Sequence, residues 1–418
     1  MSSPSPDASA RPVVVVGGGA AGLATAIFAA RLRPGLQPLI LDGAKRLGAK
    51  ILVSGGGRCN VTNTVVEAAD FWDPRSPFIR RLLRSFSAAD AAAFFRELGV
   101  ALHEEPGGKL FPDTNRARTV LDALLAEADR RGVRIETSRR ATGVARDGVG
   151  FRVETPVGPV VARRVVLATG GLSLPKTGSD GAGYAIAEEL GHSLVPTTPA
   201  LAPLLLDGDF HAPLSGVSLD AELAVHAPPR KPARVRGALL FTHFGVSGPV
   251  ALNASRFWHR GRAEGRDVRV TASLLPGERF EDVEGWLIDL AARRPRLTVE
   301  SALAERLPGA VAAMLVREGR IEGTSVGRLR REDRRVLVHA LVERSLPVRD
   351  SRGYNFAEVT SGGIPLSEVD PATMESRRCA GLYLVGEILD VDGRIGGFNF
   401  QWAWSSARVC AEGLVRGL

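Results

Sequence analysis

The chain has 418 residues, of which 44% are hydrophobic and 24% are charged, and its formal net charge is +8. This length is enough for two or three domains, and the composition is ordinary for a soluble globular protein. Cys59, Cys379 and Cys410 lie far apart without a C-x-x-C pair, which excludes a disulfide framework and a sulfur-rich metal site. We therefore expect no metal, and the cysteine usage suits a reducing cytoplasm.

The positive charge does not by itself predict a nucleic-acid partner. Lysine is scarce, and the arginines are spread along the chain. The densest basic region, residues 317–335, also contains Glu318, Glu322, Glu332 and Asp333. Such a mixture is typical of a solvated helical face rather than of a phosphate-binding stripe. We expect neither a nucleic-acid nor a membrane partner, and no pattern indicates an oligomeric state.

Residues 1–10, rich in serine and proline, are expected to form a disordered lead. The uncharged stretch Val13 to Ala30 that follows has the length of a membrane span or a secretion signal. The three consecutive glycines 17–19 argue against both, because each weakens a helix by about 1 kcal/mol relative to alanine. Four valines before them favour a buried parallel strand, and the alanine-rich segment after them favours a helix.

The turn between this strand and helix has the spacing Gly17-x-Gly19-x-x-Gly22. The first glycine allows a tight turn, the second lets the backbone approach a pyrophosphate, and the third lets helix and strand pack closely. A second apolar strand ends in Asp42, where a carboxylate accepts hydrogen bonds from an adenosine ribose. Together these features predict a dinucleotide-binding unit.

The middle of the chain reads as an insertion. A glycine-rich loop at 54–63, a helical stretch around 87–99 and short strands lead to the apolar run 165–171. From about Val195 the sequence becomes proline-rich, with strand candidates to about Leu275 and helical sequence over 279–345. From residue 357 the strand and helix patterns of the first part of the chain begin again. We expect a nucleotide-binding domain at 11–195 and 354–418, interrupted by residues 196–353.

Three segments place glycines and small polar residues after a predicted strand, namely 54–60, 168–171 and 386–401. Such strand ends form the ligand crevice of an open α/β sheet. A ligand touched by all three segments and by Asp42 must be long, so FAD fits better than NAD. Arg58 can hold phosphate or an electron-rich ring, and we favour phosphate. Asp390 is a candidate for a polyol chain.

Four long motifs carry a family resemblance: residues 47–63, 165–204, 239–249 and 373–407. They resemble the BaiN-like (YhiN-type) family of bacterial flavoproteins, described as NAD(P)/FAD-dependent oxidoreductases, from about Arg11 to the C-terminus. The resemblance implies a Rossmann-like FAD-binding domain interrupted by an inserted β-barrel plus helical domain. Residues 178–187 are also similar to the flavoprotein subunits of the fumarate reductase class. Asp42 stands where the family usually has glutamate, and Asp180 and Ala182 depart from the usual STGDGY.

The candidate cofactor-binding residues combine the strand-end segments with what the resemblance implies. They are Gly17, Gly19, Ala20, Ala21, Gly22, Asp42, Lys50, Ser54, Gly56, Gly57, Arg58, Cys59, Asn60, Ala141, Thr169, Gly170, Gly386, Glu387, Asp390, Gly396, Gly397 and Asn399. No histidine precedes the 54–60 loop in the position that indicates a covalent flavin, so we expect non-covalent FAD.

The expected activity is hydride transfer through FAD to or from a small organic substrate, with a conjugated enone as one candidate. There is no second G-x-G-x-x-G, so NADH or NADPH, if used, docks transiently at the flavin. Cys59 lacks a partner cysteine, which favours a packing role. His243 and Arg58 are both weak candidates for a catalytic role. For His243 the alternative is a structural histidine held by a hydrogen bond. An RNA-modifying flavoprotein and a flavin-binding protein without turnover stay open as alternatives.

Overall fold

The structure is a computed structural model that describes residues 11–73 and 75–416. It divides into two compact units, Met1–Thr197 with Glu358–Leu418, and Thr198–Ala357. The second unit extends four residues beyond the expected end of the insert at 353. A reason lies in its own contacts, because the Arg352 guanidinium stacks 3.3 Å over the Phe356 ring. The lead expected at residues 1–10 lies outside the described residues.

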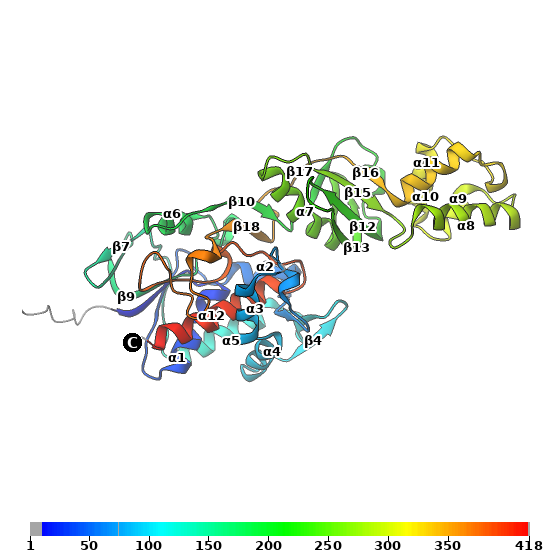
Figure 1. Ribbon diagram of the computed structural model, residues 1–418. Helices are drawn as coiled ribbons and strands as arrows, with labels where there is room; N and C mark the ends of the chain where they lie inside the picture. The colour runs from blue at the N-terminus through cyan, green and yellow to red at the C-terminus, as the bar shows by residue number, and fades with distance from the viewer. Residues whose placement is uncertain (1–10, 74, 417–418) are drawn as a thin grey trace, which may run out of the picture. The chain divides into compact units, whose positions relative to one another are not determined.

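The first unit is built on a mainly parallel sheet with the order β6-β2-β1-β9-β8-β7, in which β19 also pairs with β9. Figure 1 shows α1, α5 and α12 side by side. Its elements are β1 (Arg11–Val16), α1 (Ala20–Leu32), β2 (Leu39–Leu41), α2 (Ala49–Gly57), β3 (Thr62–Asn63), α3 (Pro77–Ser85), α4 (Ala88–Glu97), β4 (Leu102–Glu105), β5 (Lys109–Pro112), α5 (Ala117–Arg130), β6 (Arg134–Glu136), β7 (Gly143–Asp147), β8 (Gly150–Glu154), β9 (Val160–Leu167), α6 (Ala182–Glu189), β10 (Val195–Ala200, which runs on into the second unit), β18 (Val359–Gly363), β19 (Leu382–Leu384) and α12 (Phe398–Arg416).

The register of the central strands brings their carboxyl ends to one edge of the sheet. Val16 pairs with Leu41 on β2 and with Leu167 on β9. Leu384 on β19 pairs with the same Leu167. The four valines of β1 are at most 5% exposed, as expected of a strand covered on both faces. The residues that follow these four strands therefore share one edge, which is where an open α/β sheet binds its ligand.

The second unit has its own hydrophobic core and a seven-stranded sheet with the order β16-β15-β12-β13-β14-β11-β17. The two end strands of this order are separated in the chain only by Pro347, so the sheet curls round into a barrel. Its elements are β11 (Leu204–Leu206), β12 (Ser218–His226), β13 (Ala233–Thr242), β14 (Gly245–Ser247), α7 (Gly248–Ala263), β15 (Arg269–Ser273), α8 (Phe280–Arg293), α9 (Val299–Ala304), α10 (Gly309–Glu318), α11 (Arg331–Val342), β16 (Arg344–Leu346) and β17 (Val348–Ser351).

The helices of the described ranges include none that is both long and apolar enough to cross a bilayer. The stretch from Val13 that has the length of a membrane span instead forms β1, a glycine turn and α1. The two units with their separate sheets confirm the expected Rossmann-like α/β fold with an inserted barrel and helices.

Candidate functional site

The glycine turn between β1 and α1 gives each of its three motif glycines a different reason to lack a side chain. Gly17 has a φ of +105°, and a Cβ there would lie 2.5 Å from the Ala168 carbonyl oxygen. A Cβ on Gly22 would lie 1.9 Å from the Gly17 carbonyl oxygen, so helix and turn touch directly. A Cβ on Gly19 would meet no atom within 4 Å. The fold thus requires glycine at positions 17 and 22, and it leaves open space at position 19.

The first turn of α1 is a suitable place for an anion. Gly19 is the N-cap and offers no side chain, and the first turn contains no acidic residue. The first N–H groups of any helix lack a partner within the helix, and the helix dipole makes this end positive. Ala20 and Ala21 therefore present backbone donors beside the open space at Gly19, as a pyrophosphate requires.

Asp42 follows β2 and lies at the same turn. Its Oδ2 accepts a hydrogen bond of 2.7 Å from the Gly18 amide, and its Oδ1 accepts one of 2.7 Å from the Ala44 amide. Each carboxylate oxygen can accept a second hydrogen bond. The two amides fix the carboxylate beside the glycine turn and leave it able to accept from ribose hydroxyls.

The segment after β19 reaches the other side of the same turn. Gly386 has a φ of +74°, and a Cβ on it would lie 2.8 Å from the Cβ of Ala21. Its carbonyl accepts from the Trp402 indole at 3.0 Å, and its amide donates to the Ser406 hydroxyl at 3.1 Å. Two side chains of α12 therefore hold Gly386 against the start of α1.

A polar network connects the next residue, Glu387, with three other segments. The Lys50 ammonium donates to Glu387 and to the Ser173 hydroxyl. Glu387 Oε1 accepts from Ser173 Oγ at 2.7 Å and from the Thr360 amide at 2.9 Å. The expected residues Lys50 and Glu387 are thus brought together. Ser173 and Thr360 were missed, because only the tertiary fold brings them to this carboxylate.

The glycine-rich segment expected as a loop begins inside α2. The helix is kinked at Ser54, Gly55 and Gly56, which have non-helical dihedral angles, and the Ser54 hydroxyl donates to the Ile51 carbonyl. Gly56 and Gly57 are exposed and have positive φ angles. These two glycines offer accessible backbone, whereas the Ser54 hydroxyl already has a partner within the helix.

Cys59 and Asn60 end this segment in the interior. Burial raises the pKa of the Cys59 thiol to about 12, although a hydrogen bond with Ser54 opposes the shift. The thiol is therefore neutral near pH 7, which fits a packing role. With its amide oriented to satisfy its neighbours, Asn60 accepts from the Gly397 amide at 3.0 Å. This bond fastens the 54–60 segment to the one that precedes α12.

Arg58 contacts the hairpin that follows it in the chain. Its guanidinium lies 2.5 Å from Glu105 and 4.2 Å above the Phe111 ring, both on the β4–β5 hairpin. The pKa of Glu105 is lowered, chiefly by its hydrogen bond with Arg58. Glu105 already neutralises the guanidinium, and the phosphate contact of Arg58 favoured from the sequence stays a prediction. Arg58 fixes the end of α2 against the hairpin.

The strand end after β9 contributes Thr169 and Gly170. The buried Thr169 hydroxyl has no hydrogen-bond partner within the described part of the chain. Gly170 has a φ of +73° and packs against Ser179. A buried hydroxyl left unpaired costs free energy, so Thr169 fits a site that acquires a polar partner on binding. Ala141 is buried, and the segment before it reaches the Asp42 carbonyl through the Arg139 amide at 2.8 Å.

The segment before α12 largely binds itself and its neighbours. Asp390 accepts from the Gly362 amide at 3.1 Å, and Asn399 exchanges hydrogen bonds with the backbone of Gly393. A Cβ on Gly397 would lie 2.5 Å from the backbone of Thr62, and the Gly396 carbonyl accepts from Asn63 at 3.0 Å. These contacts shape the segment, and a polyol-binding role for Asp390 stays a prediction.

Glu358 is a titratable group that the sequence did not single out. Its pKa is raised because desolvation by the surrounding protein outweighs the attraction of Lys50 and Lys109. Its side chain is nevertheless accessible to water. An accessible carboxyl group that retains its proton at higher pH is able to act as an acid. The carbonyl of Glu358 also accepts from Ser173 at 3.4 Å, so it adjoins the Lys50–Glu387 network.

His243 lies in the second unit, in the tight turn between β13 and β14. It is exposed, and its ring centroid is 5.0 Å from that of Phe244. No side-chain hydrogen bond joins His243 to any other residue that the structure describes. The alternative of a hydrogen-bonded structural histidine is therefore wrong, and its catalytic role stays a prediction.

The first unit as a whole fits the dinucleotide part of FAD. The turn leaves room at Gly19, the start of α1 offers unpaired donors, and the Asp42 carboxylate has free acceptor capacity. The unpaired Thr169 hydroxyl lies at the end of a strand adjacent to that turn. These features come from three of the four strands that share an edge.

Comparison with known proteins gives a family. The profile of the HI0933-like protein Rossmann domain matches residues 11–413. The chain is 35% identical to the ribosomal RNA dihydrouridine synthase of Escherichia coli (strain K12), over 96% of this chain and 97% of that protein. It is 34% identical to the 3-dehydro-bile acid delta(4,6)-reductase of Clostridium scindens, over 94% and 96% respectively. An open flavocytochrome c3 fumarate reductase structure aligns with a TM-score of 0.49 and 15% identity, covering 98% of this chain and 78% of that one. The chain therefore belongs to the HI0933-like Rossmann family of flavoprotein oxidoreductases.

Proposed function

We propose that the protein is an FAD-dependent reductase of a carbon–carbon double bond conjugated to a carbonyl group. The observation that carries this proposal is the single sheet edge at which the glycine turn, Asp42 and Gly386 meet. The names of the two relatives point to the same acceptor chemistry. Dihydrouridine is uridine with the ring double bond next to a carbonyl reduced, and a 3-dehydro bile acid with delta(4,6) double bonds is a conjugated ketone.

The residues of the first unit would hold FAD without a covalent bond. The amides at the start of α1 would bind the pyrophosphate, Asp42 the ribose, and the accessible backbone of Gly56 and Gly57 another part of the dinucleotide. When bound, FAD supplies the hydride chemistry, and the protein supplies binding, orientation and solvent control. Lys50, fixed by Ser173 and Glu387, would place a positive charge at this edge and stabilise negative charge that develops there.

Reduction of such a double bond needs a proton as well as a hydride. We assign this step to Glu358, because its side chain is accessible and the Ser173 hydroxyl of the Lys50–Glu387 network donates to its carbonyl at 3.4 Å. Desolvation shifts the pKa of Glu358 in the direction that a proton donor needs. The carboxyl group would give its proton to the substrate carbon next to the carbonyl. Its neighbours Lys50 and Lys109 would then stabilise the carboxylate that remains.

The electron donor is proposed to be NADH or NADPH acting at the same flavin, since the chain has no second dinucleotide motif. The test begins with the absorbance spectrum of the purified protein and anaerobic bleaching by each nicotinamide separately. The bleached protein is then mixed with uridine-containing RNA or with a 3-oxo-Δ4 steroid. We expect the flavin spectrum to return with one of these acceptors. A protein that binds no FAD, or whose bleached flavin recovers only with oxygen, would refute the proposal.

A further inference from the structure

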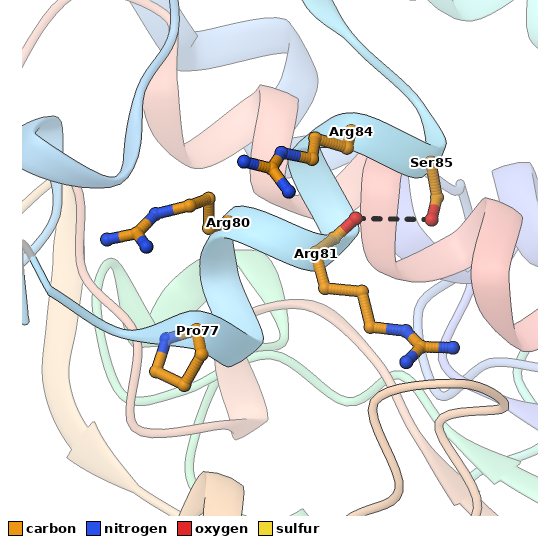
Figure 2. Close-up of a pocket in the computed structure, with 5 residues that line it drawn as sticks. All are labelled: Pro77, Arg80, Arg81, Arg84 and Ser85. Carbon is orange, nitrogen blue, oxygen red and sulfur yellow. Dashed lines mark hydrogen bonds between the residues drawn. The ribbon is translucent and has the colours of Figure 1, made fainter.

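Helix α3 of the flavin-binding unit presents an arginine face to solvent. Residues at helical spacing along α3 line an open hollow of about 310 Å³, and they are Pro77, Arg80, Arg81, Arg84 and Ser85. The opposite face of the helix buries Ile79, Leu82 and Leu83. Figure 2 shows the three guanidinium groups projecting away from the helix, with those of Arg80 and Arg84 extending to the same side in this view. We call Arg80, Arg81 and Arg84 the α3 arginine face.

Many described arginines of this chain pair with a carboxylate, whereas those of the α3 arginine face do not. No carboxylate lies within ion-pair distance of its three guanidinium groups among the residues described. By contrast, Arg394 pairs with Asp70 and Arg31 with Glu127 in the same unit. Like charges four residues apart, such as Arg80 and Arg84, destabilise a helix. The face therefore does not stabilise α3, and its charge is available to an external anion.

We infer that the α3 arginine face binds the phosphate backbone of an RNA substrate. Guanidinium groups bind phosphate through paired hydrogen bonds, and an open row of charges suits a polyanion better than one small ligand. An anionic membrane fits less well, because a membrane-surface helix needs a free apolar face, and the apolar residues of α3 are buried. This inference rests on the proposed function and narrows its acceptor to a uracil ring within RNA.

The backbone before α3 connects this face to the candidate flavin site. The Trp72 amide donates to the Asp392 carbonyl at 3.0 Å, and the Arg394 amide donates to the Asp70 carbonyl at 2.9 Å. Phe71 and Gly393 form a β-bridge between the same two segments. Residues 392–394 belong to the segment that runs from Gly386 to α12. RNA bound to α3 would thus lie on the unit that is proposed to bind the flavin. The segment 392–394 of the candidate flavin site is hydrogen-bonded to the residues just before α3.

The test compares two triple variants of the full-length, flavin-loaded protein. R80Q/R81Q/R84Q removes the α3 arginine face, and R317Q/R320Q/R328Q removes the same charge from exposed arginines of the second unit. Affinity for a labelled 20-nucleotide single-stranded RNA is measured by fluorescence anisotropy at several salt concentrations. Each phosphate contact contributes about 0.7 to the slope of log affinity against log salt, so losing three contacts should lower it by about 2. This corresponds to roughly 100-fold weaker binding at 0.1 M salt, if the affinities converge at 1 M.

We expect this loss only in the α3 variant, and we expect R80K/R81K/R84K to retain most of the slope, because it retains the charge. Equal loss in both glutamine variants would show an effect of net charge and overturn the inference. The inference would also be overturned if R80Q/R81Q/R84Q bound RNA as tightly as the parent but no longer bound phosphatidylserine vesicles. Reduction of a free nucleoside or steroid by the same variants tests the proposed function separately, since neither small acceptor needs the α3 arginine face.

Discussion

The open space at Gly19 leads to a prediction in which flavin binding and folding separate. In Gly19→Ala, the added methyl group would meet no protein atom within 4 Å, and the φ of −80° at this position suits alanine. The variant should therefore melt within about 1 °C of the parent in its flavin-free form. The methyl group would occupy the space that the pyrophosphate needs. Loss of one hydrogen bond to a charged group costs about 1.5–3 kcal/mol, so FAD should bind about 10- to 150-fold more weakly.

Gly22→Ala is the matched control, because its methyl group would lie 1.9 Å from the Gly17 carbonyl oxygen. Neither backbone segment can move without strain. The free energy of unfolding of this variant should therefore be lower by at least about 1–3 kcal/mol, even without flavin. Thermal unfolding of the flavin-free proteins and titration of FAD fluorescence measure the two effects. If Gly19→Ala binds FAD as tightly as the parent, the pyrophosphate does not approach Gly19 and our placement of FAD is wrong.

Three further predictions concern single carboxyl and imidazole groups. Asp42→Ala should weaken FAD by about 1.5–3 kcal/mol, and equal flavin occupancy of variant and parent at limiting FAD would contradict a ribose contact. Acceptor reduction should slow as pH rises through the raised pKa of Glu358, because the acid form is lost, and Glu358→Gln should be slow at every pH, with flavin content unchanged. Burial lowers the pKa of His259 from 6.5 to about 4, so the folded state binds its proton less readily than the unfolded chain. The contribution of His259 to the free energy of unfolding is complete above pH 6.5 and falls by about 3 kcal/mol by pH 4. Urea unfolding of the parent and of His259→Gln at both pH values measures this loss. We expect the variant to lose less stability than the parent between the two pH values.

Local chemistry made part of the site predictable from sequence. The Gly17–Gly22 spacing and the valines before it encode a strand, a turn and a helix by sterics alone, and these elements are confirmed. The partners of Arg58 were not predictable, because Glu105 and Phe111 reach it only when the β4–β5 hairpin folds back on α2.

The α3 arginine face was overlooked for a related reason. Sequence shows how dense the charges are, but not which of them are paired. Residues 317–335 are richer in arginine than α3, yet they also contain acids, and Arg344 pairs with Glu318. The three arginines of α3 became a candidate only once the structure showed them exposed along one helix, lining one hollow, with no carboxylate partner among the described residues.

The two ends of the second unit lie side by side, which bears on how this module entered the chain. Strand β11, near the start of the second unit, is hydrogen-bonded to β17, near its end, with Leu204 opposite Ser351. The Arg352 amide also donates to the Pro203 carbonyl at 2.9 Å, so the two connections leave the barrel side by side. A module whose ends adjoin can enter or leave a host chain at a single surface turn without stretching either partner. Lineages of this fold could therefore exchange their inserted modules while retaining one flavin-binding framework.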